Sequence, residues 1–491
     1  MEQYILGIDQ STSGTKAILF DADGAVFGRH DLEHRQIVDE HGWVEHVPDE
    51  IYGNLIKAVA GVIEKTAIDP ASIVAAGLSN QRETSIVWNR KTGTPVYNAI
   101  VWQCARGEPI CRRLIEQGYG ETIRKSTGIP ASPYYSAAKL AWIVENVPEA
   151  RELGGRGMLC CSTMDAWLVF KLCGGVPQTE YSNASRTQLF NIGALQWDED
   201  VCGLFGIRTE WLPRVVDSNS LFGKSDFGGV LPAPIPLHGV LGDSHGALYG
   251  QGCLSPGSVK ATYGTGSSVM MNVGDKPMFS DAGIVTSLAW GLDGRVSYVL
   301  EGNMNYTGAV IRWLVDDMRM LASSKEAEAV ARSARDVPGL YLIPAFSGLG
   351  APYWDGSARA AIVGMSRGVG RAEIVRAAEE CIAYQIADIV RLMQAATGLK
   401  IDALKVDGGA TRDSFLMQFQ ADIIDAAVLV PAFEELSGSG PAYLAGMAMH
   451  WYSKDVVSRE PKIRYQSTMT VEERDRRCQG WRNAIEMVLS R

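Results

Sequence analysis

The stretch YILGIDQSTSGTKAILF at residues 4–20 decides the fold. Its apolar ends predict two buried strands, at Tyr4–Ile8 and Thr15–Asp21, joined by a turn of small Gly, Ser and Thr residues. The amides and hydroxyls of such a turn can face phosphate oxygens. An aspartate at the end of a strand, here Asp9, can hold Mg²⁺ or its water shell. A plain β-hairpin with a polar turn is an equally good interpretation of this stretch alone.

A second stretch, SVKATYGTGSSVMMN at residues 258–272, repeats the layout of strand, turn and strand. It follows the glycine-rich segment 242–257, which we interpret as a hinge between two large domains. A third turn, with paired glycines that let a ligand approach the backbone closely, lies at Asp407–Thr411. The repeat predicts a duplicated domain with a nucleotide cleft between the copies, and we divide the chain into residues 1–250 and 251–491.

The remaining segments alternate between the two kinds of secondary structure. Apolar residues four apart predict helices, and short apolar runs predict strands. The helices are expected at about Asp49–Thr66, Arg371–Thr397, after Asp413 and at Gly440–Trp451, and further strands at Ala25–Phe27, Ile73–Leu78, Thr84–Trp88 and Leu404–Val406. This order predicts a mixed α/β architecture.

Length and composition narrow the class of protein. A chain of 491 residues is too long for one core, so two or three domains are expected. A net charge of -10 argues against nucleic acid or an anionic membrane as the main partner. Nine cysteines without a CxxC pair, no signal peptide and no apolar run of membrane-spanning length predict a soluble, cytoplasmic protein without membrane insertion.

The common nucleotide motifs are missing. Gly223-Lys224-Ser225 lacks the upstream glycine of a P-loop, because Ser218 stands there. No GxGxxG follows a predicted strand, so a dinucleotide site of the Rossmann type is unsupported. A nucleotide would therefore be held by the three strand-terminal turns.

Many longer motifs resemble one family over nearly the whole chain. They are GWVEH at Gly42–His46, NQRETSIVW at Asn80–Trp88, YNAIVWQC at Tyr97–Cys104, YYSAAKLAWIVEN at Tyr134–Asn146, NASRT at Asn183–Thr187, TYGTG at Thr262–Gly266, GLGAPYWD at Gly348–Asp355, VDGGA at Val406–Ala410 and FLMQFQ at Phe415–Gln420. The chain resembles the FGGY carbohydrate kinases and, among them, is most similar to the glycerol kinases. The resemblance implies an actin-like ATPase (ribonuclease H-like) fold whose two domains close on ATP.

The resemblance also implies a set of site residues for ATP and Mg²⁺. Asp9 would hold the Mg²⁺. The ATP-binding residues would be Thr12, Ser13, Gly14, Lys16, Thr265, Gly308, Arg312, Gly409 and Asp413. Four of these, namely Gly14, Lys16, Arg312 and Asp413, are not the residues usual in glycerol kinases, and Glu379 stands where an apolar residue is usual.

On the substrate side, the resemblance assigns Arg82, Glu83, Trp102, Tyr134 and Asp243. Arg82 and Glu83 together can grip adjacent hydroxyls. Trp102 offers a flat apolar wall and Tyr134 a phenol tip. Asp243 would accept the proton of the attacking hydroxyl. Without the family context, a surface ion pair and a core aromatic residue would be the favoured interpretations of Arg82-Glu83 and Trp102.

Two substrate positions depart from the glycerol-kinase pattern. Ser244 replaces the usual glutamine after the catalytic aspartate, and Ser268 replaces a phenylalanine that sandwiches the carbon chain. Losing the ring opens space. We therefore expect an ATP-dependent kinase for glycerol or a close polyol, with a longer polyol or ketose (a tetritol, a pentitol, ribulose or xylulose) as an alternative at equal odds.

The same fold also serves filaments, chaperones and non-catalytic sugar sensors. A filament or a chaperone would have no reason to keep Arg82, Glu83 and Asp243 together, and a non-catalytic sensor would be expected to have lost Asp243 or Asp9. By resemblance the chain is expected to form a homodimer or tetramer. Control by fructose bisphosphate is expected to be absent, since Gly228–Pro232 has no arginine.

Overall fold

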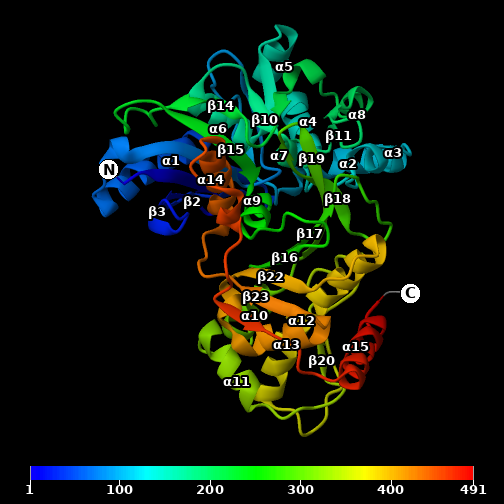
Figure 1. Ribbon diagram of the computed structural model, residues 1–491. Coiled ribbons are helices and arrows are strands. Elements are labelled where there is room, and N and C mark those ends of the chain that lie inside the picture. The colour runs from blue at the N-terminus through cyan, green and yellow to red at the C-terminus, as the bar shows by residue number, and fades with distance from the viewer. Residues whose placement is uncertain (1, 490–491) are drawn as a thin grey trace.

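The computed structural model describes residues 2–489 and has two lobes, each built on a mixed β-sheet (Figure 1). The first sheet has the strand order β14 (Leu221–Ser225), β15 (Ile235–Gly242), β6 (Ile73–Asn80), β1 (Tyr4–Gln10), β2 (Gly14–Phe20) and β3 (Val26–Glu33). The second has the order β18 (Val285–Leu292), β19 (Arg295–Met304), β17 (Ser267–Gly274), β16 (Val259–Tyr263), β22 (Ala403–Gly408), β23 (Ala427–Val430) and β24 (Ile463–Tyr465).

The two sheets repeat one topology. In the first sheet β1, β2 and β3 are antiparallel, and β6 and then β15 join β1 in parallel. In the second sheet β16, β17 and β19 are antiparallel, and β22 and then β23 join β16 in parallel. The predicted α/β fold and the predicted repeat of strand, turn and strand at residues 4–20 and 258–272 are confirmed.

Helices cover both sheets, and their ends carry the expected signals. The main ones are α1 (Pro48–Thr66), α6 (Met164–Cys173), α9 (Asp243–Gly250), α10 (Gly308–Asp316), α11 (Ala327–Ser333), α12 (Arg371–Thr397), α13 (Ser414–Ile424), α14 (Leu436–Ala448) and α15 (Val471–Glu486). α1 begins with a proline, followed by two acidic residues in its first turn. α12 ends at Gly398, which adopts the left-handed conformation that favours glycine. No helix within residues 2–489 is long and apolar enough to cross a membrane.

A smaller five-stranded sheet extends the first lobe. Its order is β4 (Ile37–Val38), β5 (Val44–His46), β8 (Ala99–Ile100), β7 (Ser85–Asn89) and β9 (Leu159–Thr163), and it packs with α2 (Glu108–Glu116), α4 (Ser136–Asn146) and α5 (Pro148–Gly155). Three of the quoted motifs meet here: the guanidinium carbon of Arg106 lies 4.5 Å from the ring centroid of Trp43, 5.8 Å from Tyr97 and 4.8 Å from Trp142. These motifs therefore serve the fold through cation–π contacts.

The glycine-rich segment 242–257 is not the open hinge that we expected. Its first half is the helix α9, which is buried and packs against α14. A Cβ atom built on Gly440 would lie 2.2 Å from the carbonyl oxygen of Gly246, and one built on Gly246 would lie 2.4 Å from the carbonyl oxygen of Ser437. The glycines thus allow two helices to touch along their backbones, which no larger residue permits.

α14 also departs from the predicted division at residue 250. It comes from the second half of the chain, yet it packs on β1, β6 and β15 of the first sheet. Figure 1 shows it, in orange-red, beside α1 and β15 and apart from α12, α13 and α15. A Cβ atom on Gly77 or on Gly239 would lie 2.3 or 2.2 Å from the carbonyl oxygen of Pro441. The second half of the chain therefore completes the core of the first lobe.

Gly440→Ala is predicted to destabilise the protein, because the added methyl group forces α9 and α14 apart. We expect a loss of about 1–3 kcal/mol, seen as a lower melting temperature by circular dichroism. Gly53→Ala is the matched control: Gly53 lies inside α1 with nothing within 4 Å of its Cβ position, and this change should stabilise by roughly 0.5–1 kcal/mol. Equal effects of the two substitutions would contradict the close helix contact.

Candidate active site

Three neighbouring parallel strands of the first sheet end at the same edge. β1 pairs with β6 and β6 with β15, with Asp9 opposite Ser79 and Gly242 opposite Asn80. Residues at the carboxyl ends of such strands converge, and ligands bind there in open α/β sheets. Asp9 at the end of β1, Arg82 after β6 and Asp243 after β15 therefore lie at one edge of the sheet.

Asp243 is the first residue of α9, and 31% of its side chain is exposed. Its Oδ1 accepts a hydrogen bond of 2.6 Å from the backbone N–H of Ser244 and lies 3.4 Å from Nε of Arg82. Burial raises the pKa of Asp243, and the carboxylate of Asp9 adds to this rise, whereas the guanidinium of Arg82 opposes it. A carboxylate whose pKa is raised is a better proton acceptor.

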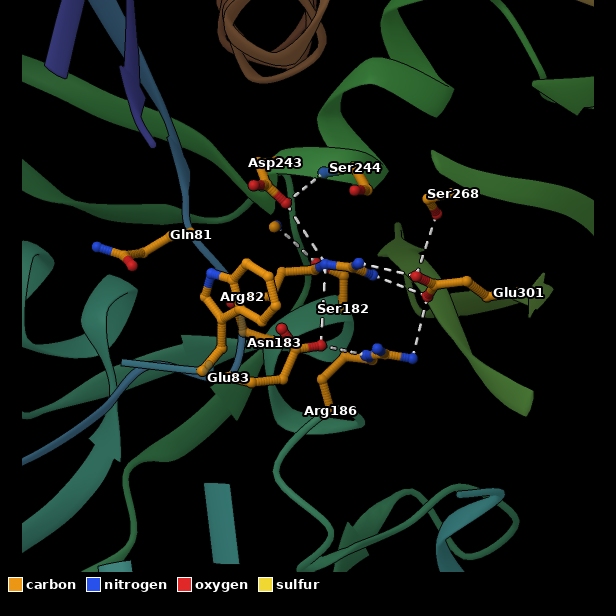
Figure 2. Close-up of polar contacts among 12 residues, drawn as sticks. Gln81, Arg82, Glu83, Ser182, Asn183, Arg186, Asp243, Ser244, Ser268 and Glu301 are labelled. Carbon is orange, nitrogen blue, oxygen red and sulfur yellow. Dashed lines mark hydrogen bonds and ion pairs between the residues drawn. The ribbon is translucent and has the colours of Figure 1, made fainter. Parts of the chain in front are cut away.

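The guanidinium of Arg82 is held by Glu301, which comes from β19 in the second sheet (Figure 2). Nη1 donates to Oε2 and Nη2 to Oε1, both at 2.8 Å. Nε faces Asp243 and lies 3.9 Å from Oε1 of Glu83. The structure thus differs from our expectation that Arg82 and Glu83 grip adjacent hydroxyls, because Glu301 already occupies the fork of Arg82.

A second arginine completes this network. Nε of Arg186 donates to Oε1 of Glu83 at 2.5 Å, and Nη1 of Arg186 lies 3.0 Å from Oε2 of Glu301. Both arginines and both glutamates are buried. Burial alone would raise the pKa of Glu301, but Arg186 and Arg82 hold it well below its usual range. The two buried carboxylates and the two buried guanidinium groups therefore balance one another's charge in a region from which water is excluded.

Sequence reasoning assigned no role to Glu301 and Arg186. Arg186 belongs to the quoted NASRT motif, and Glu301 is the acidic residue in the middle of an apolar strand segment, VLEG. A charge inside a buried strand requires a partner. That signal predicts an ion pair, but it does not identify which of the chain's arginines supplies the partner.

Trp102 and Tyr134 lie against each other at the mouth of the site. Their rings meet edge to face with centroids 5.5 Å apart, and Nε1 of Trp102 donates to Oγ1 of Thr12 at 3.0 Å. Lys139 fixes the segment that carries Tyr134, because its Nζ donates to the three carbonyl oxygens of residues 133–135. The predicted substrate wall is therefore bonded directly to the predicted phosphate turn.

The two serines that depart from the family pattern have different surroundings. Ser268 lies on β17, and its Oγ donates to Oε1 of Glu301 at 3.2 Å. Ser244 follows Asp243 in α9 and is half-buried. Ser268 is thus attached to the buried network through its hydroxyl group.

Lys16, near the start of β2, is already paired with two carboxylates. Its Nζ lies 3.6 Å from Oδ2 of Asp9 and 3.1 Å from Oε2 of Glu435, the residue before α14. Although burial opposes it, the charges of Asp9 and Glu435 raise the pKa of Lys16. The other predicted turn residues, Thr12, Ser13 and Gly14, lie beside it, and Ser11 N–H closes the turn on the carbonyl oxygen of Gly14.

The residues around Asp9 fit a magnesium ion that is shared with phosphate groups. Within residues 2–489 no cluster of three or more His, Cys, Asp or Glu side chains could hold a metal by itself. Mg²⁺ usually takes one or two carboxylates and completes its shell with water and phosphate oxygens. Burial raises the pKa of Asp9, and Lys16 and Ser79 only partly oppose this; a cation beside the carboxylate would favour its charged form.

A cavity of about 700 Å³ opens in the second lobe. It lies between the β16–β17 turn, α10, α12 and the segment before α13. Its lining includes the predicted nucleotide residues Thr265, Gly308, Arg312, Gly409 and Asp413. The size suits a ligand as large as a nucleotide. The structure therefore brings five of the nine predicted ATP-binding residues to one cavity, and the other four to the β1–β2 turn.

Two acidic groups share the wall of this cavity. Asp413 caps α13 by accepting a hydrogen bond from the N–H of Leu416 at 2.8 Å. Glu379 of α12 is buried beside it, and burial together with the charge of Asp413 raises the pKa of Glu379 well above its usual range. The raised pKa favours the neutral form of the Glu379 carboxyl group, which is the less costly form to bury.

Comparison with known proteins gives matches over both lobes. The family models described as "FGGY family of carbohydrate kinases", N-terminal and C-terminal domain, match residues 4–250 and 259–449. A glycerol kinase of Symbiobacterium thermophilum is 46% identical over 487 residues, 98% of each chain. Glycerol kinase 2 of Thermotoga maritima is 44% identical, with 99% of each chain covered.

Solved structures agree with this fold. The crystal structure of Plasmodium falciparum glycerol kinase with ADP superposes with a TM-score of 0.94 and 34% identity, covering 100% of this chain and 99% of that one. A ligand-bound xylulose kinase of Lactobacillus acidophilus has a TM-score of 0.88 at 21% identity, covering 99% and 97%, and supports the fold alone.

Arg186→Met is predicted to destabilise the protein strongly, because it leaves Glu83 and Glu301 buried with less compensation. Breaking a buried pair costs about 3–5 kcal/mol, which thermal unfolding should detect. The control is Arg156→Met: Arg156 pairs with Glu152 at 2.7 Å on the surface, and such a pair is worth at most about 1 kcal/mol. If Arg186→Met lowers the free energy of unfolding by no more than Arg156→Met does, Glu83 and Glu301 do not depend on Arg186 for charge compensation.

Proposed function

The chain belongs to the FGGY family of carbohydrate kinases, and we propose that it transfers the γ-phosphoryl group of MgATP to a terminal hydroxyl of glycerol or of a close polyol. It is a sugar or polyol kinase, a phosphotransferase that acts on an alcohol group. The proposal on the substrate rests on relatives named glycerol kinase that match the full length of the chain.

One observation carries the proposed mechanism, namely the position of Asp243 beside Arg82 at the ends of β15 and β6. As the substrate oxygen bonds to the γ-phosphorus, the bond from that phosphorus to the β,γ-bridging oxygen breaks and ADP leaves. The hydroxyl proton passes to the carboxylate of Asp243. The transition state of such transfers is loose, so positioning contributes more than base strength.

The remaining predicted substrate residues have complementary roles in this proposal. Trp102 and Tyr134 would pack against the carbon chain of the polyol. Nε of Arg82, which faces Asp243, would keep the base and the substrate oxygen in line. Glu83, with backbone φ of 59°, is fixed by Arg186 and would accept a bond from a second hydroxyl.

Family members use ATP, and we assign the cavity of the second lobe to its base and ribose. The phosphates would extend to the two turns that carry Thr265 and Thr12, where backbone amides and hydroxyls can face their oxygens. Asp9 would hold Mg²⁺, which when bound supplies positive charge next to the phosphates. Lys16 would add a second positive charge beside Asp9.

A longer polyol or ketose remains the alternative substrate, and one contact favours it. Ser268 is bonded to Glu301 and stands where glycerol kinases are expected to carry a ring. A polar wall with free volume suits a substrate with one or two additional CHOH groups. The relatives' names favour glycerol, and Ser268 favours the longer chain.

Two further proposals concern the surroundings of the enzyme. All nine cysteines are free thiols, and eight of them are buried. Free thiols persist in a reducing compartment, which agrees with a cytosolic enzyme. A dimer or tetramer of the chain stays a prediction from family resemblance.

Asp243 should set the acid limb of the pH profile. Because its pKa is raised, kcat/KM should fall as the pH drops through a value above the ordinary ~3.9 of an aspartate, since the protonated form cannot accept the proton. Asp243→Asn should lower kcat about 10²–10⁴-fold. Asp475→Asn, an exposed aspartate of α15, is the control. An Asp243→Asn enzyme with ordinary kcat would exclude Asp243 as the base.

Ser268→Phe should move the substrate preference toward glycerol. The added ring fills the space beside the carbon chain, and a change of this kind in a pocket shifts kcat/KM ratios by about 10–200-fold. A coupled assay of ADP release should compare glycerol with erythritol, xylitol, ribulose and xylulose. Ser268→Ala, which removes the hydroxyl without filling the space, is the control. If Ser268→Phe leaves the ratios unchanged, position 268 does not face the substrate.

A further inference from the structure

Glu301 is a buried carboxylate at the substrate site that comes from the opposite lobe. It lies on β19 of the second sheet, and its side chain is fully buried. Asp9, Glu83 and Asp243, the acidic residues predicted to bind Mg²⁺ or the substrate, come from the first half of the chain. Figure 2 shows Glu301 and Asp243 on different sides of the Arg82 guanidinium.

Each carboxylate oxygen of Glu301 lies against two protein groups. Oε1 accepts from Nη2 of Arg82 and from Oγ of Ser268, and Oε2 accepts from Nη1 of Arg82 and lies 3.0 Å from Nη1 of Arg186. A carboxylate has about four acceptor positions in total. Because its side chain is fully buried, Glu301 has no exposed oxygen for a substrate hydroxyl, and Arg186 and Arg82 favour its ionised form. It is unsuited to act as a base or as a substrate ligand.

These contacts determine how Arg82 can bind the other carboxylates around it. An arginine between two other carboxylates, Asp243 and Glu83, would be drawn into a bidentate pair with one of them. Instead its fork binds Glu301, and its contact with Asp243 is a single one of 3.4 Å through Nε. The oxygens of Asp243 thus remain available for the proton of the substrate.

We propose that Glu301 is a positioning residue for phosphoryl transfer: it holds the fork of Arg82 so that Arg82 orients the Asp243 carboxylate without pairing with it completely. The inference rests on the proposed function of Asp243. Glu301 acts through Arg82 and touches neither substrate, so its loss should change kcat and leave substrate binding nearly intact.

The test is Glu301→Gln in the full-length enzyme, assayed with saturating MgATP and with glycerol or the preferred polyol. We expect kcat to fall about 100-fold, the usual effect of misplacing a catalytic group by an ångström, with KM for both substrates within about threefold of the wild type. Glu152→Gln is the matched control: it makes the same change in an exposed ion pair, where Glu152 lies 2.7 Å from Arg156, and it should leave kcat unchanged.

A double-mutant cycle identifies the route. Arg82→Gln should itself reduce kcat strongly, and adding Glu301→Gln in that background should change kcat by no more than about threefold, because the residue through which Glu301 acts is gone. The inference is wrong if the fold-loss of kcat in the double variant equals the product of the fold-losses in the two single variants. It is also wrong if Glu301→Gln alone leaves kcat within about threefold of the wild type. A large rise in KM would make Glu301 a substrate ligand and would also overturn it.

Two additional variants keep the outcomes distinguishable. If Glu301→Gln does not fold, Glu301→Asp retains the charge but withdraws it by one methylene, and kcat should then fall about tenfold with KM unchanged; an unchanged kcat would contradict the inference. Asp243→Asn separates the two proposals. Ordinary activity of Asp243→Asn removes the proposed base, whereas an inactive Asp243→Asn beside a fully active Glu301→Gln removes the role of Glu301 alone.

Discussion

The backbone contact between α9 and α14 is the constraint on which the site depends. Gly246 and Gly440 let the two helices touch, and Pro441 of α14 lies against Gly77 in β6 and Gly239 in β15. α9 begins with Asp243. The same contacts that seat α14 on the first sheet therefore fix the position and direction of the helix that presents Asp243. A residue larger than glycine at these positions would push the two helices apart and displace the Asp243 carboxylate, although the residue itself does not contact Asp243.

Buried ion pairs join the two lobes close to the start of α9. Arg82 and Arg186 belong to the first half of the chain and Glu301 to the second, and each would be costly to bury without the others. Neither half could reach its final structure around these groups alone. The network therefore gives specificity to the way the lobes meet, and it places Arg82, whose charge Glu301 already balances, beside Asp243, the proposed base.

Local sequence patterns predicted much of the fold, because the signals for strands, turns and helices lie within short stretches of consecutive residues. The turn at residues 11–13 and its copy at 264–266 lie between apolar strands, and the repeat indicated a duplicated α/β fold that the structure has. The hinge at 242–257 was wrong, since glycine spacing does not distinguish a flexible link from a tight helix contact. The partner of Glu301 lies 219 residues away at Arg82, and burial alone does not identify such a partner. The cavity residues followed from family resemblance, not from spacing.

The departure at Ser268 has a consequence that substitution patterns alone do not reveal. A serine in place of a ring leaves space, which suggests a looser hold on a three-carbon substrate. Its hydroxyl, however, donates to Glu301, so the position contributes to the network that orients Arg82 as well as to the wall of the pocket. Under the proposed mechanism, substrate length and the geometry of Asp243 are therefore coupled through one side chain. A change at position 268 that restores a ring would fill the pocket and at the same time remove a hydrogen bond from Glu301, so its effects on KM and on kcat need to be separated before either is assigned to substrate fit.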